Sequence, residues 1–470
     1  MAQFSFSKTL LFLTTLTTMS IFVISQPPSP PLDPAEQESI YRILESINPG
    51  ISWRSLFPDD LCTSAPHGVV CGYFSDTPAG TPHVTELSFG YVSDYSPNPP
   101  CDSNSTLDPS LLSPLTHLKK LFFYKCFTET KTPFPNFSTL SSSSLEELVF
   151  IENPALFGSI NGKLSSLKGL RRLVLTGSNV SGGLSDGFGD FSNLEQLTLS
   201  RNNFTGEISK NVFQTMKKLK ILDLSDNGFS GNIPESIRNL TELLKIDLSF
   251  NGFSGKIPEI FKVLENLEFL DLSYNNFGNF GLPLFLAEMP SLKEVYLSGN
   301  LLGGRIPEIW GKMRGILGIG LSGVGLVGNI PKSIGVNLGN LCYLGLDNNS
   351  LEGVVPNEFG DLEFLSELNL ENNNLSGRLP FSGDFVSKLG VKLKLEGNMD
   401  LCIDEGLKSA KFGVSLGQLK VCRQRLIPKT TLYYENSSSS RLLLHLHGSL
   451  AFMSIVFFFS LPFLVFIAFV

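Results

Sequence analysis

LKILDLSDNGFSGNIP (residues 219–234) and LLKIDLSFNGFSGKIP (243–258) repeat one pattern, in which spaced leucines precede an asparagine, a glycine and an Ile-Pro pair. A third clear copy, LKEVYLSGNLLGGRIP, covers residues 292–307. The asparagine position can be followed through twelve units, at Cys126, Asn153, Ser178, Asn202, Asn227, Asn251, Asn275, Asn300, Val324, Asn349, Asn373 and Asn398. Successive positions lie 24 or 25 residues apart after a first interval of 27. Such a fixed period predicts a repeat array.

The pattern predicts what each unit does. In LxxLxLxx the leucines face inward from a short strand and the intervening residues face solvent. The inward asparagine can bond backbone groups of the buried turn, which need partners. One unit cannot bury its apolar side alone, so neighbours must stack. We expect an α/β solenoid, a right-handed superhelix of about 12 repeats with a parallel concave β-sheet, irregular or short helical returns and cysteine-flanked caps.

Three units depart from the asparagine rule. Cys126, Ser178 and Val324 stand at its position, and Val324 is expected to leave its turn without a side-chain partner. The unit around Val324 (residues 315–331) is rich in glycine and lacks bulky concave residues. It is therefore expected to form either a local bend or a close-contact site.

The repeats resemble the plant extracellular leucine-rich repeat, whose pattern is LxxLxLxxNxLxGxIPxxLxxL. The segment around Trp53 and GVVC (68–71) is similar to the N-terminal cap of that family, and Cys402 with Cys422 to its C-terminal cap. The chain resembles receptor-like proteins without a kinase, most closely the Piriformospora indica-insensitive protein 2 type. The resemblance implies a partner receptor kinase, in defence, development or response to root fungi.

The chain divides into six predicted segments. They are a signal peptide (1–25), an N-terminal cap (26–105), the repeat array (106–400), a C-terminal cap (401–425), a linker (426–449) and a hydrophobic tail (450–470). The cap should begin with a helix capped by Asp33, with Pro34 in its first turn and Glu36 three residues after the cap. Secretion makes disulfides expected for three local cysteine pairs, Cys62–Cys71, Cys101–Cys126 and Cys402–Cys422. Cys342 is expected to be a buried, unpaired thiol, the alternative being an intermolecular disulfide.

The tail has two interpretations. Twenty-one residues without a charge (450–470) are long enough to span a bilayer. Small residues at Ser437, Ser438 and Ser439, followed by a spacer and this apolar run, also fit a signal for a glycosylphosphatidylinositol (GPI) anchor. The absence of a basic sequence after the run favours the anchor. Either reading places the protein on the secretory pathway to the outer face of the plasma membrane.

Composition and motifs argue against several classes of function. A net charge of −8 argues against nucleic acid as a partner. The sequence shows no nucleophile motif, phosphate-binding loop or metal-ligand cluster, so we expect no enzyme activity, cofactor or metal. Asn-x-Ser/Thr sequons predict a glycoprotein, at Asn104, Asn136, Asn179, Asn203, Asn239, Asn348, Asn374 and Asn436.

The exposed positions of the concave strands are where a ligand would bind. An acidic and aromatic set gathers there, consisting of Asp223, Asp247, Phe250, Phe269, Asp271, Tyr274 and Tyr296. The competing interpretation is that LDLSxN is simply a common form of the repeat, so that these residues need have no role in binding. Exposed aromatic residues on a rigid surface are typical interface anchors, so we expect an extracellular peptide, protein or glycan to bind here. The alternative function is a secreted, wall-associated inhibitor of a pathogen polysaccharide-degrading enzyme.

Overall fold

A computed structural model of the protein describes residues 30–423, apart from 65, 75–79, 91–97, 141–143, 187, 189, 410–415 and 417–418. Met1–Cys422 forms one compact unit and Arg423–Val470 a second, of which only Arg423 is described. The predicted signal peptide, hydrophobic tail, sequon Asn436 and anchor site (Ser437, Ser438, Ser439) lie outside the described residues, as does the linker. None of the helices in the described part is long and apolar enough to cross a membrane.

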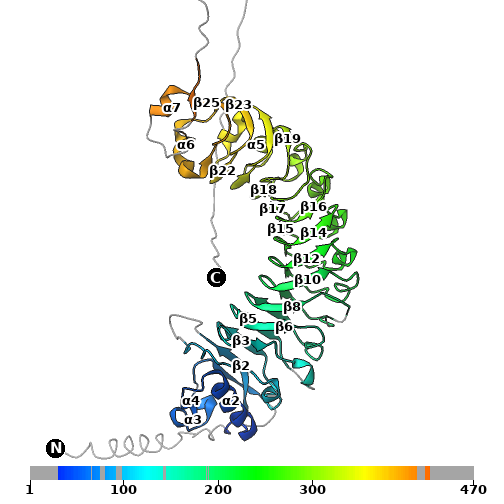
Figure 1. Cartoon of the computed structure of the whole chain (residues 1–470), viewed down its shortest axis with the longest axis vertical. Helices are drawn as coiled ribbons and strands as arrows, with labels where there is room; N and C mark the ends of the chain where they lie inside the picture. Colours follow the sequence, from blue (N-terminus) through cyan, green and yellow to red (C-terminus); the bar gives the residue numbers. More distant parts are fainter. Residues whose placement is uncertain are drawn as a thin grey trace, which may run out of the picture. The chain divides into compact units, whose positions relative to one another are not determined.

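Short strands from successive repeats form the main sheet on the concave side of the array (Figure 1). Its first pair is antiparallel, and every later pair is parallel from β2–β3 onward. The described strands, in their order across the sheet, are β1 (Val69–Phe74), β2 (Thr81–Phe89), β3 (Lys120–Tyr124), β5 (Glu147–Ile151), β7 (Arg172–Thr176), β9 (Gln196–Thr198), β11 (Ile221–Asp223), β13 (Lys245–Asp247), β15 (Phe269–Asp271), β17 (Glu294–Tyr296), β18 (Gly318–Gly320), β20 (Tyr343–Gly345), β22 (Glu367–Asn369) and β24 (Leu393–Lys394).

The predicted leucine positions form the core. Leu222, Ile246 and Leu270 pair in register on adjacent strands, and each is fully buried. Residues on either side of them face the concave surface and are partly exposed. The period-2 alternation of a strand therefore separates core from recognition surface within three residues.

The asparagine positions bond the backbone as predicted. Asn251 donates from Nδ2 to the carbonyl oxygens of Leu224 (2.9 Å), Leu248 (3.2 Å) and Ser249 (3.1 Å), while its Oδ1 accepts the Phe229 N–H (3.0 Å). One side chain thus joins two consecutive repeats.

The expectation for Val324 was wrong. The backbone N–H groups of Val324 and Leu326 both donate to Oδ1 of Asn349, at 3.1 and 2.9 Å. The following repeat therefore supplies the side-chain partner, and Val324 itself is fully buried. Ser178 differs, because its buried hydroxyl lacks a hydrogen-bond partner among the described residues.

The return side of the repeats holds more β-structure than the sequence pattern predicted. Two further sheets run along it. The described strands of the first are β4 (Thr132–Pro133), β6 (Leu156–Ser159), β8 (Asn179–Gly182), β10 (Asn203–Glu207), β12 (Gly228–Gly231), β14 (Gly252–Gly255) and β16 (Asn276–Phe277). Those of the second are β19 (Val327–Asn329), β21 (Ser350–Gly353), β23 (Asn374–Arg378), β25 (Asp400–Ile403) and β26 (Lys420–Val421). In the first of these sheets buried phenylalanines stack: Phe229 lies between Phe204 (5.9 Å) and Phe253 (6.2 Å), which aligns neighbouring returns.

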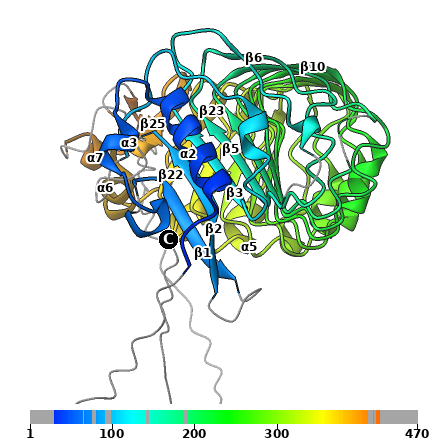
Figure 2. The same cartoon turned by 90° about the horizontal axis from the view of Figure 1, so that it is seen from below.

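Short helices complete the returns and caps. The α-helices of the described part are α2 (Pro34–Ile47), α3 (Trp53–Leu56), α4 (Leu61–Ser64), α5 (Ser333–Asn337), α6 (Gly383–Leu389) and α7 (Glu405–Ser409). Its 3-10 helices are η1 (Pro109–Leu112), η2 (Phe137–Thr139), η3 (Glu235–Asn239), η4 (Glu259–Val263), η5 (Leu284–Glu288), η6 (Trp310–Lys312), η7 (Asn357–Asp361) and η8 (Gly390–Lys392). Figure 2 shows α2 lying across the β1–β3 end of the main sheet.

The N-terminal cap begins as predicted, with one difference. Oδ1 of Asp33 accepts the N–H groups of Ala35 (2.8 Å) and Glu36 (3.2 Å), which caps α2. The Glu36 carboxylate does not complete a capping box; it turns inward to His83 and the Val84 N–H.

The cysteines divide as expected into three pairs and one free thiol. Disulfides join Cys62–Cys71, Cys101–Cys126 and Cys402–Cys422. Cys342 is free, but it is partly exposed rather than buried. It immediately precedes β20, at a position beside the inward leucine, and this explains the exposure.

Candidate recognition surface

The structure brings one predicted column of side chains together on the concave sheet. Asp223, Asp247, Asp271 and Tyr296 occupy the last residues of β11, β13, β15 and β17 and pair directly in register. Side chains at matching positions of adjacent parallel strands lie on the same face. The column is thus acidic over three repeats and aromatic at the fourth.

Burial and mutual repulsion affect these acids. The pKa of Asp247 is raised, first by burial and also by the charge of Asp223. The pKa of Asp271 is raised by burial, with a further contribution from Asp247. Both carboxylates accept a hydrogen bond from the backbone N–H two residues on, Ser249 (3.2 Å) and Ser273 (2.8 Å), which opposes the shift. The column therefore holds negative charge at an energetic cost.

Phe250 and Tyr274 form an aromatic shelf beside this column. Their ring centroids are 4.3 Å apart and their planes differ by 17°, and each side chain is about half exposed, at 53% and 52%. Both residues have a left-handed backbone, with φ of 52° and 53°. Gly299 stands at the same position of the next repeat, where an added Cβ would lie only 2.6 Å from the Tyr274 ring. The ring of Tyr274 therefore lies against Phe250 in the preceding repeat and Gly299 in the next.

Phe269 contacts Tyr296 and Lys245. It lies 5.6 Å from Tyr296, centroid to centroid, and Nζ of Lys245 sits 4.7 Å from the centroid of its ring. The same Nζ is 3.8 Å from a carboxylate oxygen of Asp247. Lys245 therefore links the acidic column to the aromatic residues.

Sequence reasoning missed Tyr343. This residue opens β20, and its ring centroid lies 6.1 Å from that of Tyr296, across the glycine strand β18. Burial raises the pKa of both tyrosines, and Tyr296 also donates a hydrogen bond from its hydroxyl to Glu294 (2.8 Å). Tyr343 follows Cys342 directly and could have been found by indexing every concave column.

The glycine-rich unit is a close-contact site within the chain. An added Cβ at Gly318 would meet the Tyr296 hydroxyl at 2.8 Å, and one at Gly320 would meet its ring at 2.6 Å. An added Cβ at Gly345 would similarly lie 2.5 Å from the Tyr343 hydroxyl. Because glycine has no side chain, both tyrosine rings can pack against the sheet at these positions.

Six of the predicted glycosylation asparagines in the described part are exposed: Asn104, Asn136, Asn179, Asn203, Asn348 and Asn374. Asn239 is partly buried and lines an open hollow on the return side, together with Asn232 and Lys256. Asn348 occupies the same left-handed turn position as Phe250 and Tyr274, in a later repeat. A glycan at Asn239 would fill the return-side hollow, whereas one at Asn348 would border the tyrosines.

Comparison with known families matches only the repeats. The family described as Leucine rich repeat matches residues 168–229, 192–253 and 320–375, and single Leucine Rich Repeat units match 266–288 and 291–313. Of the two shelf residues, Phe250 lies in the matched range 192–253 and Tyr274 in the matched range 266–288.

The relatives compared are plant proteins from Arabidopsis thaliana. Receptor like protein 29 is 33% identical over 36% of this chain and 35% of its own length. Protein TOO MANY MOUTHS is 36% identical over 30% of this chain and 27% of its length. Piriformospora indica-insensitive protein 2 is 36% identical over 31% of this chain and 33% of its length. The matches thus span about a third of each relative, and they do not single out one type.

Solved structures show the same architecture. The PEPR1–AtPEP1 crystal structure is 26% identical, with a TM-score of 0.59 over 78% of this chain and 52% of that one. The leucine-rich repeat ectodomain of the Arabidopsis thaliana receptor kinase GASSHO1/SCHENGEN3, in complex with CASPARIAN STRIP INTEGRITY FACTOR 2, is 25% identical. Its TM-score is 0.53 over 63% of this chain and 40% of that one.

Proposed function

We propose that the chain is a plant extracellular leucine-rich repeat protein of the receptor-like group and that it recognises an extracellular peptide or protein through its concave face. The observation that carries the proposal is the shelf of Phe250 on Tyr274. Two stacked rings that remain half exposed on turns beside a rigid sheet offer apolar area at little cost in conformational entropy.

The charges around the shelf favour one kind of ligand. Asp223, Asp247 and Asp271 stand beside it, with Lys245 as the nearby cation. A ligand that brings a cationic or hydrogen-bond-donating group would relieve the repulsion within the column. We therefore propose a segment with an apolar or aromatic anchor next to a basic side chain.

Signalling is proposed to pass through a partner. The GASSHO1/SCHENGEN3 ectodomain belongs to a membrane receptor kinase and holds a bound factor. Because the chain is similar to receptor-like proteins and to this ectodomain, a receptor kinase is the partner we propose. Defence, development and response to root fungi remain the proposed settings.

Display at the outer face of the plasma membrane is part of the same proposal. The apolar run 450–470 follows small residues at Ser437, Ser438 and Ser439, as in a GPI signal. Treatment of intact cells with a phosphatidylinositol-specific phospholipase should release the protein into the medium. Retention with the membrane would instead favour a spanning helix.

Cross-linking at the surface of living plant cells tests the recognition function. The tagged full chain would be captured after cross-linking, and its partners identified by mass spectrometry. Partners captured by the natural protein should be lost from a Phe250→Ala/Tyr274→Ala variant and retained by Phe280→Ala, which removes an exposed aromatic residue after β16, a return-side strand. Equal capture by all three proteins would contradict the proposal.

A further inference from the structure

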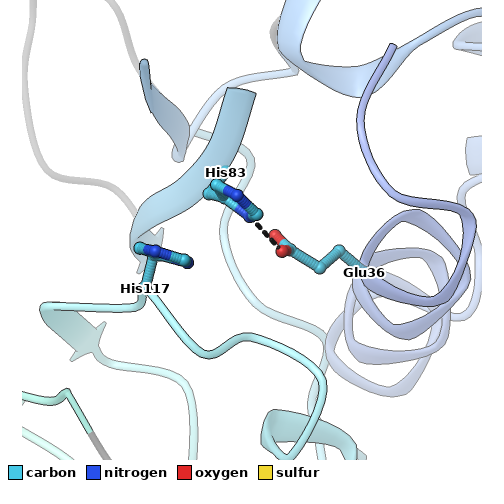
Figure 3. Close-up of side chains that lie close together, drawn as sticks. All are labelled: Glu36, His83 and His117. Atoms are coloured by element: carbon cyan, nitrogen blue, oxygen red, sulfur yellow. Dashed lines mark hydrogen bonds and ion pairs between the residues drawn. The ribbon is translucent and has the colours of Figure 1, made fainter. Parts of the chain in front are cut away.

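Three side chains where the N-terminal cap meets the repeat array converge from separate elements (Figure 3). Glu36 comes from α2, His83 from β2 and His117 from the segment before β3. One potential ligand atom from each lies within 4.8 Å of the others. We propose that this cluster is a binding site for a divalent metal ion that favours imidazole, with Zn²⁺ as the first candidate.

The donor set fits such an ion. Zn²⁺ binds imidazole nitrogen and carboxylate oxygen at about 2.0–2.2 Å, commonly with three protein ligands and one open position. Ca²⁺ and Mg²⁺ prefer oxygen throughout, so two histidines select against them. Ligand atoms on a tetrahedral Zn²⁺ would be about 3.4 Å apart, so Nδ1 of His83 and Oε1 of Glu36, which lie 2.5 Å apart without the ion, would have to move apart to share it.

The surroundings orient the ligand atoms. Nδ1 of His83 faces Oε1 of Glu36 at 2.5 Å, while its Nε2 lies 3.4 Å from the Thr81 hydroxyl. Nδ1 of His117 lies 3.1 Å from the Thr116 hydroxyl, and we assign Nε2 as the nitrogen that would bind the metal. Metal-bound histidines commonly use their second nitrogen in this way.

The carboxylate is held ready as well. Glu36 is only 3% exposed, and its Oε2 accepts the Val84 N–H at 3.1 Å. The two imidazole rings stack with centroids 3.9 Å apart, and the ring of Phe74 lies 4.5 Å from that of His117. A plain Glu36–His83 ion pair would account for two of these groups. A shared metal ion would use all three.

A metal here would join the cap to the array. It would tie α2 to the first parallel strand of the sheet and to the segment that enters β3. Because the metal would bind the folded chain and not the unfolded chain, it would stabilise the folded state by mass action. The open fourth position, on the side of the partly exposed His117, would hold water or a donor atom from a partner.

Titration of the full-length chain tests the site. The chain would carry His445→Ala and His447→Ala, which remove the H-x-H pair of the predicted linker, and would be freed of metal with a chelator at neutral pH. Calorimetry with Zn²⁺ should then show one site, and Ca²⁺ should show none. In this background His117→Ala and Glu36→Gln should each weaken Zn²⁺ binding by at least about tenfold, the smaller effect known for supporting residues.

The control is His67→Ala, which removes an exposed histidine of the same cap and should leave Zn²⁺ binding unchanged. Circular dichroism would verify that each variant folds. Visible absorption of added Co²⁺, which reports tetrahedral coordination, would give a second readout. The proposal is overturned if Zn²⁺ does not bind stoichiometrically, or if it binds His117→Ala and Glu36→Gln as tightly as the parent.

Discussion

The ring of Phe250 stacks on that of Tyr274 at 4.3 Å, although both residues hold a left-handed backbone that bulky side chains rarely adopt. The left-handed region costs an L-residue about 1–2 kcal/mol. An aromatic pair returns roughly 0.5–1.5 kcal/mol beyond the area that it buries. The two energies are of similar size, so the stacked pair adds little to the stability of the fold. We infer that these aromatic residues serve binding.

Phe250→Gly tests this balance. Glycine relieves the backbone cost while removing the ring, as Gly299 does at the same position two repeats later. We expect the free energy of unfolding to change by no more than about 1 kcal/mol, while partner capture is lost. A loss of stability of several kcal/mol, measured by chemical denaturation, would show that the ring serves the fold.

Asn275→Ala should destabilise the array by about 2–4 kcal/mol, because buried polar groups would lose their partners. The Asn275 side chain donates to three backbone carbonyls and accepts the Phe253 N–H at 3.0 Å. The matched control is Asn276→Ala, one residue on and exposed. Similar unfolding midpoints for the two variants would refute the role given to the asparagine positions.

Asp247→Asn should stabilise the protein at neutral pH. The pKa of Asp247 is raised in the folded chain, so the folded state holds a proton that the unfolded state has released between the two pKa values. Stability therefore falls as pH rises through that window, and the loss persists above it. Asparagine avoids the loss and can still accept the Ser249 N–H, as Asn369 accepts that of Glu371 in the same column.

The measurement is the free energy of unfolding of both proteins across pH. Their difference should shrink as pH falls towards the ordinary aspartate value near 3.8. Asp361→Asn, which removes an exposed carboxylate on η7, controls for net charge. A constant difference at every pH would contradict the assignment.

Gly320→Ala should displace the Tyr296 ring and cost about 1–3 kcal/mol, because the new methyl group would lie 2.6 Å from it. The control Gly315→Ala adds its methyl group to open space. Adding Tyr296→Ala to Gly320→Ala should remove most of the penalty, which a double-mutant cycle would measure. Additive effects would mean that the two residues do not touch.

The repeating part of this protein could be predicted from sequence, because Leu222, Asn251 and their equivalents recur in a fixed period. The return-side sheets were missed because NGFSG reads as a turn, whereas in the structure such segments pair with the return strands of neighbouring repeats. The stacking of Phe250 on Tyr274 was expected because the two residues occupy the same position in adjacent repeats. The contact of Tyr343 with Tyr296 could be recognised only from the full strand register across β18. Glu36 and His83 come together through the cap, which has no period to index.

The most direct test of the central claim is site-specific photo-cross-linking on plant cells. A photoreactive phenylalanine analogue would replace Tyr274 on the shelf or Phe280 after β16, both of which are exposed aromatic positions. We expect a discrete cross-linked peptide or protein at position 274, lost when Phe250→Gly is added, and none at position 280. Cross-linking of one partner at position 280 but not at 274 would place recognition away from the concave face and contradict the account.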